Sequence, residues 1–211
     1  MRDEIAIKVA RYLLQSKAIK LEPANPFTWA SGWKSPIYCD NRITLSYPEI
    51  RNYIKEAFCS IIKAEYANAE LIAGVATGGI PQGALVAGEL GLPFIYVRAT
   101  PKSHGLENLI EGLIQPGKKV VVIEDLISTG GSSLKAVDAI RESGMLVEGM
   151  CAIFTYGFKA AEDSFASKAC RLLTLSNYPV LVKEAFQTGY ISEDQMDELS
   201  KWRMDPGNWK V

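Results

Sequence analysis

A chain of 211 residues, 48% of them hydrophobic, is long enough to form one domain with a large buried core. With 23 basic and 24 acidic side chains its formal net charge is -1, and no Lys/Arg-rich block provides the broad basic surface typical of nucleic-acid binding. The most apolar runs, Leu71–Ala76 and Val120–Ile123, are too short to cross a bilayer, and the first residues lack the pattern of a signal peptide. The four cysteines are widely spaced, which is not typical of a disulfide framework or a zinc site. Together these features predict a cytoplasmic protein with reduced thiols.

The first third of the chain predicts two helices separated by a turn-rich segment. Ile5, Val9 and Leu13 recur at helical spacing and indicate an amphipathic N-terminal helix. Residues 27–40 are aromatic and punctuated by Gly and Pro, which favours short strands and turns. A second helix is expected to begin near Pro48, because apolar residues follow it at helical spacing.

From residue 71 onward, short apolar runs alternate with helical patterns. The expected strands are Leu71–Val75, Phe94–Arg98, Lys119–Glu124, Val147–Thr155 and Arg171–Thr174. The expected helices are Gln82–Glu89, Ser132–Ser143 and Ser192–Lys201, the last with a capping box from Ser192 and Gln195, and Thr100–Gly112 is expected to be a long loop. This alternation predicts an α/β fold with a mostly parallel central sheet flanked by helices, in which ligands bind beyond the carboxyl ends of the strands.

The segment from Val120 to Ser133 is the most informative in the sequence. An apolar strand is expected to carry Glu124 and Asp125 at its tip, and a hydroxyl- and glycine-rich turn then leads into a helix. The free backbone N–H groups and the dipole of a helix N-terminus suit a phosphate, and Ser128, Thr129, Ser132 and Ser133 can add hydroxyl donors. The carboxylates can accept hydrogen bonds from sugar hydroxyls or act through a metal. A ribose 5-phosphate therefore fits the segment, with its phosphate on the turn and its hydroxyls on the carboxylates. The alternative is an ordinary strand–turn–helix with a capping serine.

A second Thr-Gly-Gly sequence, Thr77–Gly79, also follows an expected strand. It suggests a second anion-binding turn at the same sheet edge, although a simple tight turn is equally consistent with it. Two glycine-rich segments do not match the known nucleotide-binding motifs. Gly112–Lys119 ends in Lys and precedes a strand, unlike a P-loop, and Gly74–Gly83 lacks the spacing of a dinucleotide-binding turn.

Four segments together resemble one known family. Val121–Ser133 resembles the 5-phosphoribosyl 1-pyrophosphate (PRPP) signature of type I phosphoribosyltransferases. Phe27–Tyr38, Gly74–Pro81 and Arg98–Gly105 resemble the N-terminal motif, the pyrophosphate loop and the mobile catalytic loop of the orotate phosphoribosyltransferase family. The resemblance covers roughly residues 19 to 155. It implies one domain over residues 1–211, with a small N-terminal base-covering lobe (about 1–45), an α/β core (about 46–190) and a C-terminal helix and tail (about 191–211).

The resemblance also implies an activity and partners. Members of that family transfer ribose 5-phosphate from PRPP to orotate with Mg²⁺, and they release orotidine 5′-monophosphate and pyrophosphate in de novo pyrimidine biosynthesis. It further implies a homodimer in which each catalytic loop closes over the partner's active site. No membrane or nucleic-acid partner is expected.

The expected site residues divide by the part of PRPP that each would contact. Lys102 and Asp125 are the expected catalytic residues, and Lys102 would stabilise the leaving pyrophosphate together with Arg98 and His104. The expected substrate-binding set is Arg98, Lys102, His104, Glu124, Asp125, Leu126, Ile127, Ser128, Thr129, Gly130, Gly131 and Ser132, with no dedicated protein metal ligand.

Three positions depart from the family pattern: Ala30, Ala99 and Tyr156 stand where many members carry a cation. Backbone N–H groups near residues 34–38 are therefore the candidates to hold the orotate carboxylate. Two alternative functions remain open: a phosphoribosyltransferase for another base, which Phe27–Tyr38 would decide, and a regulatory module that binds PRPP without turnover. The second would not need Lys102 and His104 on a mobile loop.

Overall fold

The computed structural model describes residues 2–29, 32–100 and 109–209. A six-stranded sheet forms its centre, in the order β10-β9-β8-β5-β6-β7, and every neighbouring pair is parallel except β6 and β7. Its strands are β5 (Leu71–Val75), β6 (Phe94–Val97), β7 (Ile110–Glu111), β8 (Lys119–Ile127), β9 (Leu146–Thr155) and β10 (Leu172–Asn177). The predicted mostly parallel sheet is thus confirmed, and β8 lies inside it between two parallel neighbours.

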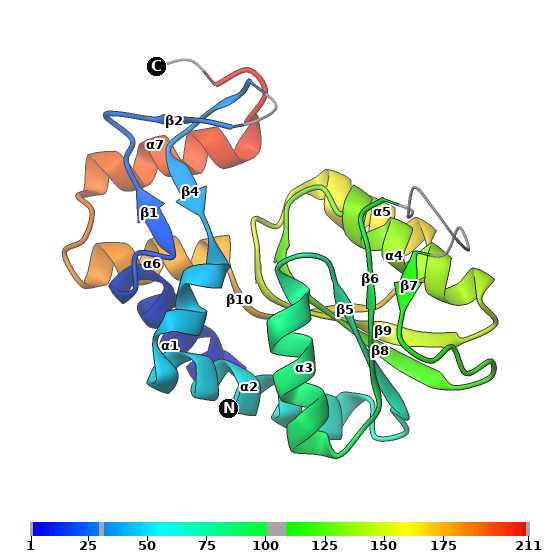
Figure 1. The fold of residues 1–211 in the computed structure, drawn as a ribbon. Helices are drawn as coiled ribbons and strands as arrows, with labels where there is room; N and C mark the ends of the chain where they lie inside the picture. Colours follow the sequence, from blue (N-terminus) through cyan, green and yellow to red (C-terminus); the bar gives the residue numbers. More distant parts are fainter. Residues whose placement is uncertain (1, 30–31, 101–108, 210–211) are drawn as a thin grey trace.

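Helices cover both faces of this sheet (Figure 1). One face is covered by α1 (Arg2–Gln15), α2 (Pro48–Glu65) and α3 (Gly79–Leu90), and the other by α4 (Gly131–Glu142) and α5 (Lys159–Ser167). The side chains of β8 alternate between two cores: Val121 packs with the α2 side, and Val122 with the α4 side. No helix in the described part of the chain combines the length and apolarity needed to cross a membrane.

Segments from both ends of the chain build a smaller lobe beside the sheet (Figure 1). It contains the antiparallel pair β1 (Ile19–Leu21) and β4 (Ile37–Cys39), the pair β2 (Phe27–Thr28) and β3 (Lys34–Ser35), the 3-10 helix η1 (Asn41–Ser46), and helices α6 (Tyr178–Gln187) and α7 (Glu193–Met204). The Trp29 and Trp202 rings join the two ends, with centroids 5.6 Å apart. The C-terminal helix is therefore packed against the N-terminal strands.

Most expected elements are confirmed. The N-terminal helix, the helix from Pro48, the short strands within residues 27–40 and the strand Leu71–Val75 all form. The capping box at α7 is present, with Ser192 and Gln195 bonded in both directions.

Several expected boundaries and elements differ from the structure, including the strand predicted over Arg171–Thr174, which runs to Asn177. The strand predicted to end at Glu124 continues to Ile127, because β9 pairs with it that far. The helix predicted from Gln82 begins at Gly79, so part of the glycine-rich turn is helical. Of the loop predicted over Thr100–Gly112, residues 101–108 lie outside the described part of the chain, and Ile110–Glu111 form β7, which pairs antiparallel with β6 and is too short to show periodicity. Helices α5 and α6 were not expected.

Candidate active site

The two acidic residues of β8 point to opposite faces of the sheet, as neighbours in an extended strand must. Glu124 turns toward α4, where its Oε2 accepts a hydrogen bond from Ser133 Oγ over 2.9 Å and its Oε1 accepts one from the Asp125 N–H over 2.9 Å. Asp125 turns toward α3, since a Cβ on Gly78 would lie only 2.2 Å from the Asp125 Cγ. Asp125 is half-buried and is therefore the more accessible of the two carboxyl groups.

Burial changes the acidity of Glu124, which is only 5% exposed. Removal from water is the largest cause that raises its pKa to about 9, and the neighbouring Asp125 adds to the rise. The hydrogen bonds from the Asp125 N–H and Ser133 act in the opposite direction. Burial therefore favours the protonated form of Glu124 over the charged one.

The turn after β8 leaves the start of α4 open to an anion. Gly130 is the N-cap residue at φ +84°, and no side chain caps the helix, so its first N–H groups have no side-chain acceptor. Glycine is required at this position because a Cβ would lie 2.8 Å from the Phe165 ring. Thr129 and Ser132 are exposed at the turn. Ser133, expected to offer a further hydroxyl donor, is instead buried and bonded to Glu124.

The second Thr-Gly-Gly turn lies at the same edge of the sheet as the first. It follows β5, the parallel neighbour of β8, and α3 begins there from Gly78 without a side-chain cap. The packing is tight, because a Cβ on Gly79 would lie 2.3 Å from the Ile123 carbonyl oxygen. The expectation that both turns share one sheet edge is therefore confirmed, and Asp125 packs against Gly78 of the second turn.

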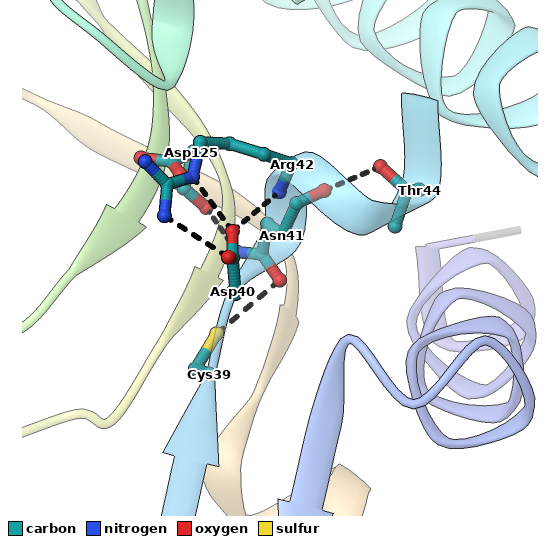
Figure 2. A network of polar contacts seen from close by, with 6 residues as sticks. All are labelled: Cys39, Asp40, Asn41, Arg42, Thr44 and Asp125. Atoms are coloured by element: carbon teal, nitrogen blue, oxygen red, sulfur yellow. Dashed lines mark hydrogen bonds and ion pairs between the residues drawn. The ribbon is translucent and has the colours of Figure 1, made fainter. Parts of the chain in front are cut away.

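A polar network ties the smaller lobe to Asp125 (Figure 2). The buried Asn41 donates from Nδ2 to the Asp125 backbone oxygen over 2.7 Å, and its Oδ1 accepts from Cys39 Sγ at 3.3 Å. Beside it, Arg42 holds Asp40 through two hydrogen bonds, which lower the pKa of Asp40. Sequence reasoning missed Asn41, since a polar residue after a strand gives no sign that it will be buried against another strand.

A cavity of about 270 Å³ opens where the lobe meets the core. It is lined by Thr28, Trp29, Tyr38, Cys39, Leu126, Ser128 and Tyr156. None of these side chains is a cation, and the volume lies near the lower end of small-molecule pockets, which start at about 300 Å³. The cavity suits one small heterocycle. Leu126 and Ser128 were expected at the site, whereas Trp29 and Tyr156 were not.

Of the three expected cationic residues, the structure describes only Arg98. Arg98 follows β6, and its Nη1 lies 3.5 Å from Oε1 of Glu111. Lys102 and His104 lie outside the described residues. Near the cavity, Lys34 Nζ donates to Thr28 Oγ1 over 2.9 Å. Because Thr28 lines the cavity, a positive charge lies next to the cavity wall.

The parallel sheet, the strand–turn–helix and the adjoining ring-sized cavity define a phosphoribosyltransferase, and residues 45–183 match the phosphoribosyl transferase domain family. The orotate phosphoribosyltransferase of Phocaeicola vulgatus is 62% identical over 96% of this chain and 95% of its own, and that of Bacteroides thetaiotaomicron is 61% identical over 95% and 94%. The crystal structure of orotate phosphoribosyltransferase from Aeropyrum pernix is 26% identical, with a TM-score of 0.74 over 87% of this chain and 99% of that one. The chain belongs to the orotate phosphoribosyltransferase family.

Proposed function

We propose that this protein transfers ribose 5-phosphate from PRPP to orotate, giving orotidine 5′-monophosphate and pyrophosphate. One observation carries the proposal: the ring-sized cavity opens at Ser128, the first residue of the turn that leads to the uncapped start of α4. A base in the cavity and a 5′-phosphate on the turn would thus lie at the two ends of a single nucleotide. The family membership supports the same substrate pair.

The described residues take distinct parts in this reaction. Backbone and hydroxyl groups of Thr129–Ser132 hold the 5′-phosphate, with Gly130 and Gly131 allowing close approach. Asp125 and Glu124 hold the ribose hydroxyls, with Asp125 the more accessible. Leu126 and Ser128 contact the base. Ile127, which is fully buried, anchors the end of β8 between them. The turn at residues 77–79, with Arg98, Lys102 and His104, receives the pyrophosphate.

Positioning is the main demand of this chemistry. Pyrophosphate leaves the anomeric carbon while positive charge develops on the ribose, and a ring nitrogen of an acidic heterocycle attacks. No strong general base is needed, so aligned donors and excluded water supply most of the acceleration. Lys102 is the proposed group that stabilises the charge on the departing pyrophosphate.

The donor set at this edge fits Mg²⁺ held jointly by protein and substrate. Among the described residues, no group of three or more His, Cys, Asp or Glu side chains could hold a metal by itself. Mg²⁺ is commonly bound through one or two carboxylates plus substrate phosphates, and Asp125, half-buried against Gly78, offers such a carboxylate. When bound, Mg²⁺ would neutralise charge on the leaving pyrophosphate.

The proposed assembly is a cytoplasmic homodimer in which the segment carrying Lys102 and His104 reaches the partner's active site. The family resemblance supports this arrangement. No feature of the described residues favours a nucleic-acid partner, because acidic and basic residues are nearly balanced over the chain.

A panel of bases tests the function. The protein is incubated with PRPP, Mg²⁺ and, in turn, orotate, uracil, hypoxanthine and adenine, and nucleotide products are separated by chromatography. Orotidine 5′-monophosphate is the expected main product. A product from another base only would keep the phosphoribosyl site and replace the base assignment. PRPP binding without any product would favour the regulatory module.

A further inference from the structure

The C-terminal helix α7 backs two walls of the base cavity. Trp202 is fully buried, and its ring makes edge contacts with Trp29 and Tyr156, at centroid distances of 5.6 and 5.8 Å. Trp29 and Tyr156 both line the cavity, and their own rings lie 5.3 Å apart. Trp202 does not line the cavity, so it can influence a bound base only through these two rings.

Arg203, the next residue, binds the backbone of Tyr156 and Gly157 behind the same side of the cavity. Its Nε donates to the Tyr156 carbonyl oxygen over 2.9 Å, and its Nη2 donates to the Gly157 carbonyl oxygen over 3.0 Å. A Cβ on Gly157 would lie 2.9 Å from this Nη2, so glycine leaves room for the guanidinium. Within the described part of the chain, Arg203 forms no ion pair, and its donors serve the two carbonyls instead.

The helix that carries this pair is itself fixed. Its N-terminus has the capping box of Ser192 and Gln195, and Tyr178 Oη donates to the Leu199 carbonyl oxygen over 2.9 Å. Leu199 is fully buried. Because α7 is capped at its N-terminus and bonded at its middle, Trp202 and Arg203 are held in fixed positions against Trp29 and Tyr156.

We propose that Trp202 and Arg203 are positioning residues for the base, setting the separation of Trp29 and Tyr156 from α7. This inference rests on the proposed function, because it assigns the orotate end of the site to that cavity. It predicts an effect confined to the base. The phosphate turn at residues 128–132 lies on a different element, so PRPP affinity should not depend on α7.

The test compares Michaelis constants for the two substrates in four variants. Arg203→Ala is expected to raise the KM for orotate about tenfold, while the KM for PRPP stays within about twofold. Arg203→Lys should recover part of the loss, because one ammonium can still donate to a carbonyl. Trp202→Phe, which keeps an aromatic ring, should raise the orotate KM without abolishing folding. Lys201→Ala is the matched control, since Lys201 is exposed and pairs with Glu198.

Melting curves establish that each variant is folded before its kinetics are compared. A merely structural role would reduce the active fraction, lowering kcat and leaving both Michaelis constants unchanged. An unchanged orotate KM in folded Arg203→Ala, or an equal rise in both constants, would overturn the proposal. A wild-type protein that does not consume orotate would instead contradict the proposed function itself.

Discussion

At the scale of single residues, the two acidic residues of β8 differ in how deeply their carboxyl groups are buried. Glu124 is enclosed and bonded to Ser133, whereas Asp125 packs against Gly78. Sequence reasoning identified both residues, because paired acids after an apolar run are conspicuous. It could not predict that Ser133 would be used internally, since a buried hydroxyl and an exposed one look alike in a sequence.

The raised pKa of Glu124 predicts a pH-dependent stability. A carboxyl group whose folded pKa lies above its unfolded value contributes stability that is complete below the unfolded pKa, near 4.5, and is lost as pH rises through about 9. Glu124→Gln removes this loss. The melting temperature of the variant minus that of the wild type should therefore increase steadily from pH 5 to pH 9, measured without substrate or Mg²⁺. A difference independent of pH would contradict the assignment; Glu162→Gln, at an exposed position, is the control.

Lys34 is the described cation whose effect on orotate is easiest to isolate. Its Nζ bonds to Thr28 Oγ1 at the cavity wall, so it should attract the orotate carboxylate. The lysine is exposed, and solvent weakens its charge, so Lys34→Ala should raise the orotate KM only about threefold. Lys63→Ala, at the exposed end of α2, is the control. Equal orotate constants in wild type and Lys34→Ala would assign the carboxylate to neutral donors.

At the scale of elements, the decisive feature is the close contact between the start of α3 and strand β8, where Gly78 packs against Asp125. The boundaries of β5 were predictable, because an apolar run ends in a glycine-rich turn. The full length of β8 was not, because its last residues are held by backbone pairing with Phe154 and Thr155 of β9 rather than by an apolar pattern. Helix α6 was missed although Asn177 caps it and Pro179 lies in its first turn, whereas α5 has no side-chain cap to mark its start.

Gly78→Ala tests that contact. A methyl group there would occupy the space of the Asp125 carboxyl group, although the backbone at φ -68° would accept alanine. Displacing Asp125 by about 1 Å should lower kcat/KM for PRPP by about a hundredfold. Gly88→Ala lies in the same helix with open space around its Cβ, so activity should persist and stability should rise slightly. If both variants kept full activity, Asp125 would not be needed where the structure places it.

At the scale of the whole molecule, both ends of the described chain build the lobe beside the proposed base cavity. The sequence motif Phe27–Tyr38 predicted a base-covering lobe near the N-terminus. It could not reveal the role of α7, because Trp29 and Trp202 are brought together only by the complete fold.

The proposed dimer predicts complementation between two inactive variants. Lys102→Ala lacks the loop cation, and Asp125→Asn lacks the carboxylate of the site. If each loop serves the partner's site, a mixed dimer regains one intact site. Equal mixing after subunit exchange should then restore about a quarter of the wild-type activity. The recovery is measured by comparing initial rates before and after subunit exchange. Light scattering should give a mass near twice 23.2 kDa, as expected for a dimer. No recovery in a demonstrated mixed dimer would place Lys102 in its own subunit's site.

Transfer of ribose 5-phosphate to orotate is tested most directly by the ultraviolet absorbance of orotate mixed with the protein, PRPP and Mg²⁺. We expect a loss of the orotate signal that requires all three components and disappears in Lys102→Ala. An unchanged orotate signal with the folded wild-type protein, under conditions where PRPP binding is independently detected, would contradict it.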